Sequence, residues 1–163
     1  MKANAKKETI YANIIMLAVF FFAFLGTEYL FDNCMMYVTD ASGVVRAQNQ
    51  MLGVSAIGFL LYNWISGFLA DKSPWVTGGT GLLAFGVGAG CMGCIILHAG
   101  YVQMMIAGGV LFFLLGVLGA GVHYRMAYSV YDRAMLARCV GFAYAGGIFL
   151  QFLNNNMIHE NHT

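Results

Sequence analysis

The chain alternates long apolar stretches that hold no charged residue with short polar segments that hold nearly all of its charges. The charge-free stretches cover residues 9–27, 51–70, 73–97, 99–124 and 139–159. Each approaches or exceeds the roughly 20 residues that an α-helix needs to cross the hydrocarbon core of a bilayer. The pattern therefore predicts an all-α membrane protein with five transmembrane helices, at about residues 9–31, 48–70, 75–97, 101–124 and 137–157.

Composition supports this prediction. The chain is 60% hydrophobic and 9% charged, with a mean hydropathy of +0.72, which leaves too little polar surface for a water-soluble domain of 163 residues. A membrane β-barrel is disfavoured because its strands would alternate polar and apolar residues. The net charge of +1 and the absence of a basic run argue against a nucleic-acid partner. Without a linker or a soluble segment, residues 1–163 are expected to form a single helical membrane domain in a lipid bilayer.

The basic residues indicate an orientation. With a cytoplasmic amino terminus, seven of the eight basic residues lie on the cytoplasmic side: Lys2, Lys6, Lys7, Lys72, Arg125, Arg133 and Arg138. Only Arg46 is then outside, as the positive-inside rule predicts. We therefore expect an integral protein of the cell (plasma) membrane with a cytoplasmic amino terminus and an outer carboxyl terminus.

Polar residues inside or next to the predicted spans are the candidates for binding a substrate or a proton. Glu28 and Asp32 are spaced one helical turn apart, on one face if the first helix continues past Tyr29. Acidic groups are costly in lipid and usually face a cavity or a partner. Asn63, Gln151 and Asn155 are candidates to line a central cavity, although hydrogen bonds between helices would explain their presence equally well.

Small residues and cysteines are expected to have structural roles. Gly86 and Gly90 in the third span, and Gly116 in the fourth, are spaced to let helix backbones approach closely. The Cys91–Cys94 pair forms a CxxC pattern inside an apolar span that lacks charged residues to stabilise a thiolate. No metal site, no cofactor and no catalytic constellation has convincing spacing, so we do not expect an enzyme.

A motif lies between the second and third predicted spans, where residues 67–75 read GFLADKSPW. This segment resembles the cytoplasmic signature of the major facilitator superfamily, which occupies the loop between helices two and three. Gly67, Asp71 and Lys72 match that signature, whereas Pro74 and Trp75 replace its second glycine and the following basic residue. The segment from Asp132 to Gly141 is similar to the family's arginine-rich connection into helix five. The resemblance covers the chain as helices one to five of an amino-terminal six-helix bundle.

The resemblance implies a function. In the family, a cytoplasmic gating motif opens and closes during alternating access, and its counterparts here are Gly67, Asp71, Lys72, Arg133 and Arg138. Independently of the family, an aspartate at this turn offers an acceptor for the first amides of the next helix. The chain is then expected to be a truncated or fragmentary secondary transporter of a small solute. The missing carboxyl-terminal half, a second chain or copies of itself would complete it.

An alternative from another class is a transporter-like membrane sensor or binding module that has lost transport. Two departures from the family favour it. The second half of the motif is lost, and Phe112 and Phe113 stand where many proton-driven members carry an arginine.

Overall fold

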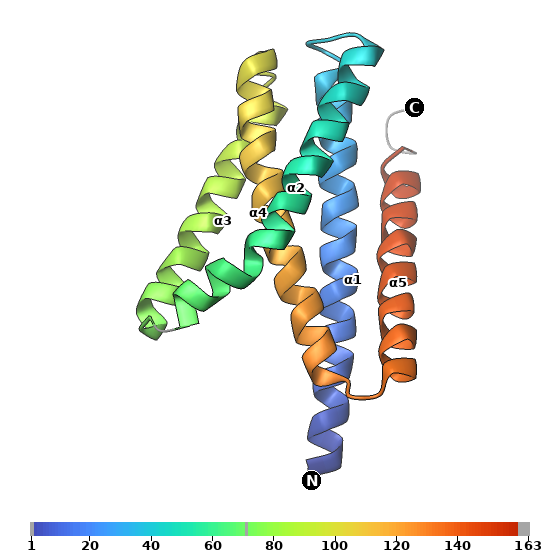
Figure 1. Cartoon of the computed structure of the whole chain (residues 1–163). Helices are drawn as coiled ribbons and strands as arrows, with labels where there is room; N and C mark the ends of the chain where they lie inside the picture. Colours follow the sequence, from blue (N-terminus) through green and yellow to red (C-terminus); the bar gives the residue numbers. More distant parts are fainter. Residues whose placement is uncertain (1, 71, 160–163) are drawn as a thin grey trace. The chain divides into compact units, whose positions relative to one another are not determined.

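The computed structural model describes residues 2–70 and 72–159, and over these residues it consists of five helices (Figure 1). They are α1 (Lys2–Met35), α2 (Ala41–Ala70), α3 (Pro74–Ile96), α4 (Tyr101–Ser129) and α5 (Arg133–His159). All five are long and apolar enough to cross a membrane. The predicted all-α chain with five candidate membrane spans is therefore confirmed, and the length and composition of its helices indicate an integral membrane protein. The partial six-helix bundle stays a prediction.

Helices α2 and α5 begin several residues before the predicted spans because an aspartate caps each of them. The Asp40 carboxylate accepts hydrogen bonds from the Ser42 hydroxyl and the Gly43 amide, each at 2.9 Å. The hydrogen bond from Ser42, and after it the one from Gly43, holds the pKa of Asp40 below its ordinary value. Similarly, the Ala134 amide donates to the Asp132 carboxylate at 2.9 Å. Capping satisfies amides that have no partner within the helix, so both helices extend into polar sequence.

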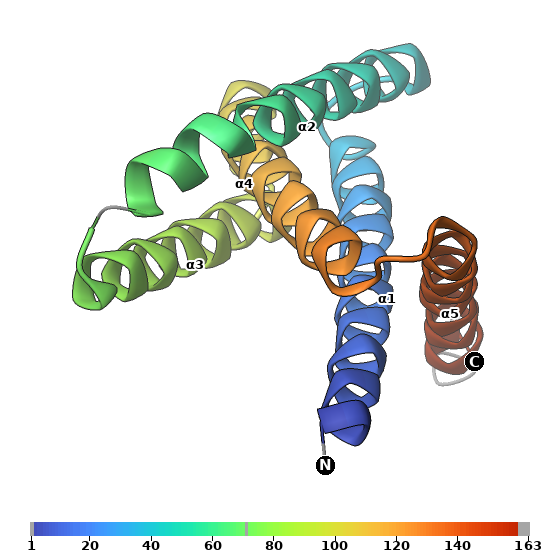
Figure 2. The ribbon, with the colours of Figure 1, turned by 60° about the horizontal axis from the view of Figure 1, so that its bottom comes forward.

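The described residues group into two compact units, and α1 and α4 contribute residues to both. The first unit comprises residues 1–27 and 121–163. Its core is built from α1, α4 and α5, and α1 and α5 lie side by side in both views (Figures 1 and 2). The buried residues of this core are Ile10, Leu17, Val122, Met126, Val130, Cys139 and Ala143. A Cβ added at Gly147 of α5 would lie only 2.8 Å from the Cβ of Phe21 on α1, so α1 and α5 approach each other closely at this point.

The second unit comprises residues 28–120. It contains the end of α1, all of α2 and α3, and most of α4. Phe31 and Phe112 are fully buried and meet edge to face, with ring centroids 5.7 Å apart. A Cβ at Gly116 would collide with the carbonyl oxygen of Ser55, and a Cβ at Gly58 with that of Phe113. The backbones of α2 and α4 therefore touch at two points, which confirms the packing role predicted for Gly116. Whether the chain forms one domain stays a prediction.

Gly86 and Gly90 of α3 have more open surroundings than Gly116 of α4. A Cβ at Gly86 or Gly90 would meet nothing within 4 Å, and Cys94 is exposed. The prediction that Gly86 and Gly90 bring helix backbones together is therefore wrong within one chain. The spacing of small residues alone does not show which face of α3 is turned toward its neighbours.

Candidate functional site

The acidic pair of the first span lies on one continuous helix, because α1 extends to Met35. Glu28 and Asp32 are both half-buried and belong to the second unit. The Gln48 side chain on α2 donates a hydrogen bond from Nε2 to Glu28 Oε1 at 2.9 Å. A neutral amide therefore holds the Glu28 carboxylate between α1 and α2.

Asp32 lacks such a partner. Its Oδ1 atom is buried, and no hydrogen bond reaches that atom from the described residues. A buried carboxylate oxygen without a donor is costly and uncommon in folded proteins. Asp32 is therefore the polar group of the candidate site that most needs a proton, a cation or a donor from outside the described chain.

The two polar candidates of the last span pair with each other. Gln151 donates from Nε2 to Asn155 Oδ1 at 3.2 Å along α5. Its own Oε1 is buried without a hydrogen-bond partner among the described residues and would be 3.5 Å from a Cβ at Gly26 of α1. Asn155 is exposed. Gln151 thus places an unused acceptor against α1 within the first unit.

Asn63 is separate from these groups. It is exposed on α2, and its backbone carbonyl accepts a hydrogen bond from the Ser66 hydroxyl at 3.1 Å. The ligand-binding role suggested for Asn63 stays a prediction.

The motif residues fall at the turn between α2 and α3 and at the start of α5. A Cβ at Gly67 would meet nothing within 4 Å, and Lys72 Nζ lies 4.9 Å from the centroid of the Phe68 ring. Arg133 and Arg138 are exposed on α5 in the first unit. Asp71 lies outside the described residues, so the cytoplasmic gating motif stays a prediction.

Sequence reasoning missed a polar contact between α4 and α5. His123 Nε2 lies 2.7 Å from the Tyr144 hydroxyl, and the Tyr144 ring stacks on Phe21 with centroids 4.2 Å apart. Phe20 meets the His123 ring edge to face. The available signal was one histidine and one tyrosine in consecutive apolar spans, which the sequence alone cannot pair.

A second missed contact joins α1 to the end of α4, where the Asn13 amide donates to the Ser129 hydroxyl. Over the described residues, no three histidine, cysteine, aspartate or glutamate side chains gather in a way that could hold a metal ion. The polar side chains that the structure does bring together here, Asn13 with Ser129 and His123 with Tyr144, form hydrogen bonds between helices.

Comparison of the chain with protein-family models, with curated proteins and with solved structures gave no match.

Proposed function

We propose that the chain is part of a secondary transporter of the major facilitator type, which moves a small solute by alternating access when further helices complete it. The observation that carries this proposal is the buried Oδ1 of Asp32, which lies inside a candidate membrane span and accepts no hydrogen bond from the described residues. Ionisable groups inside spans are expensive, and where they occur they usually serve a substrate or ion pathway. Five long apolar helices and the motif-like segment at residues 67–75 support the same proposal.

The acidic pair favours a cationic group in the solute or a coupled cation. Two carboxyl groups one turn apart on α1 repel each other when both are ionised. Gln48 offers Glu28 a hydrogen bond but no positive charge. A positive charge placed between Glu28 and Asp32 would relieve the repulsion and give Asp32 Oδ1 a partner.

Orientation and gating complete the proposal. The amino terminus lies in the cytoplasm and the carboxyl terminus outside, in the plasma membrane. By the family resemblance, Gly67, Asp71, Lys72, Arg133 and Arg138 are the residues proposed to gate the cytoplasmic side in one state of the transport cycle. Opening of that gate would accompany the switch to the other state.

The test combines binding with uptake. The purified chain is screened in lipid nanodiscs for thermal stabilisation by small cationic, zwitterionic, anionic and neutral solutes. We expect a cationic or zwitterionic solute to raise the melting temperature, and Asp32→Asn to abolish the rise. Asp40→Asn is the matched control, because Asp40 is an exposed acid outside the candidate spans. A stabilisation that survives in Asp32→Asn would contradict the proposed site.

Uptake is then measured for the stabilising solute in cells that express the chain. Accumulation above the level seen with Asp32→Asn supports transport. Binding without accumulation would contradict transport and favour the transporter-like binding module instead. No stabilisation by any solute class would overturn both.

A further inference from the structure

Two grooves adjoin at the turn between α2 and α3. The first has a volume of about 630 Å³, lies among α2, α3 and α4, and includes Lys72 and Thr77 in its lining. The second has a volume of about 450 Å³, runs along α2 beside α3, and includes Phe68. Ile65 and Leu69 line both grooves. The two hollows therefore share a wall formed by α2.

One positive charge stands at both grooves. Lys72 lines the first groove, and its Nζ lies over the ring of Phe68, which lines the second. Within the described part of the chain, the ammonium group pairs with no carboxylate. Ser66 and Thr77 also line the first groove, and their hydroxyls donate to the backbone carbonyls of Asn63 and Ser73. A group that binds here therefore meets a cation at one end.

The start of α3 adds to the positive potential. Pro74 begins the helix, and Ser73 makes no side-chain hydrogen bond that would cap it. The amino-terminal end of a helix carries a partial positive charge that favours an anion. Helix α3 has 23 residues, so the effect of its dipole is fully developed.

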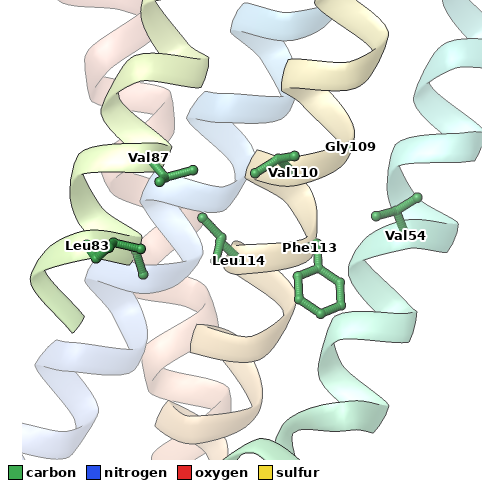
Figure 3. A pocket seen from close by; sticks show the side chains of 8 residues that line it. Val54, Leu83, Val87, Gly109, Val110, Phe113 and Leu114 are labelled. Carbon is green, nitrogen blue, oxygen red and sulfur yellow. The ribbon is translucent and has the colours of Figure 1, made fainter. Parts of the chain in front are cut away.

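Farther from the turn the hollows become apolar. A third hollow of about 410 Å³ lies between α2, α3 and α4, and Figure 3 shows its aliphatic and aromatic side chains. They include Val54, Leu83, Val87, Val110, Phe113 and Leu114. On α4, Leu114 precedes Val117 of the first groove by about one turn. The surface thus offers a positively charged end followed by apolar hollows, which is the chemical profile of the binding site of an anionic amphiphile.

We propose that this surface binds an anionic phospholipid, with its phosphate at Lys72 and the start of α3 and its two acyl chains in the adjoining grooves. Basic pockets between membrane helices on the cytoplasmic side bind anionic lipid head groups. The sorted basic residues place the α2–α3 turn on that side. The inference uses the membrane assignment and the orientation but not the transport activity, so it stands or fails separately from the proposed transporter.

Binding is measured by native mass spectrometry of the full chain, with phosphatidylglycerol and phosphatidylcholine supplied at equal concentration. We expect phosphatidylglycerol to bind more tightly, and Lys72→Gln to weaken it about fivefold, as expected for one basic residue at a lipid surface. Arg125→Gln is the matched control, because Arg125 is an exposed cation on the same expected side that lines none of the three hollows. Equal losses in both variants would overturn a site at Lys72.

A second pair of variants tests the groove without changing charge. Gly78 lines the first groove, and a Cβ at this position would meet nothing within 4 Å, so we expect the side chain of Gly78→Leu to occupy part of the groove. Gly86→Leu is its control, since Gly86 is equally open but lines none of the three hollows. We expect only Gly78→Leu to reduce phosphatidylglycerol binding. Unchanged binding in Gly78→Leu would exclude the groove.

Two further outcomes would overturn the proposal. If millimolar inorganic phosphate displaces bound phosphatidylglycerol as effectively as added lipid does, the surface is a phosphate site rather than a lipid site. A dimer that persists in phosphatidylcholine and dissociates in Gly78→Leu would identify a second copy of the chain as the occupant. A monomer that retains phosphatidylglycerol in excess phosphate supports the lipid.

Discussion

His123 Nε2 lies 2.7 Å from the Tyr144 hydroxyl and joins α4 to α5 inside candidate membrane spans. Lipid offers neither group an alternative partner, so the contact fixes the relative rotation of two helices within the first unit. Phe20 and Phe21 pack on these two rings from α1. The contact is therefore a polar link within the three-helix core of the first unit.

Tyr144→Phe should remove this hydrogen bond and leave the stacking on Phe21 in place. We expect a loss of about 0.6 kcal/mol, and at most about 2 kcal/mol, because hydrogen bonds between membrane helices are modest. Unfolding in mixed detergent measures the change. Tyr131→Phe is the control, since Tyr131 is 99% exposed. A similar loss in both variants would show that the contact with His123 contributes nothing.

Gly116→Ala should separate α2 from α4, because the added Cβ collides with the Ser55 carbonyl oxygen. Overpacking of this kind costs about 1–3 kcal/mol. Gly109→Ala on the same helix meets nothing within 4 Å and should be neutral or slightly stabilising, since alanine favours helix. Detergent unfolding of the two variants side by side gives the comparison, and equal stabilities would refute the close approach.

Asp40→Ala should fray the start of α2, whereas Asp40→Asn should preserve the cap because asparagine also accepts amide hydrogen bonds. The pKa of Asp40 is lower in the folded chain than in the unfolded chain, owing to its bonds with Ser42 and Gly43. Its stabilising contribution is therefore complete above the ordinary pKa near 4 and disappears as the pH falls through the folded value. Amide exchange protection at Gly43 and Val44 reports the effect, and Asp40→Asn should lose this dependence on pH.

The orientation can be tested with single cysteines in the two turns that flank α2. Ala41→Cys should react with an impermeant maleimide added outside the cell, and Ser73→Cys only after permeabilisation, because both positions are exposed and lie at opposite ends of α2. The unmodified chain gives the background from the four native cysteines. The reverse labelling pattern would show that the chain has the opposite orientation in the membrane.

The sequence predicted the helices better than their contacts. Apolar length is a local property, so five spans could be read directly from residues 1–163. The partners of Glu28 and Tyr144 could not, because Gln48 lies 20 residues and His123 21 residues away, on other helices. The glycines illustrate the same limit: Gly116 packs against Ser55, whereas a Cβ at Gly86 would meet nothing within 4 Å.

The division of α1 and α4 between the two units bears on how the chain is made. The second unit is one contiguous stretch, residues 28–120, and can assemble as soon as the ribosome has delivered α4. The first unit joins residues 1–27 to residues 121–163, so the first helix to be synthesised must wait for the last. During that interval Leu17 and Phe21 lack their α5 partners. Nascent α1 is therefore the segment that a membrane insertase or chaperone would have to shield.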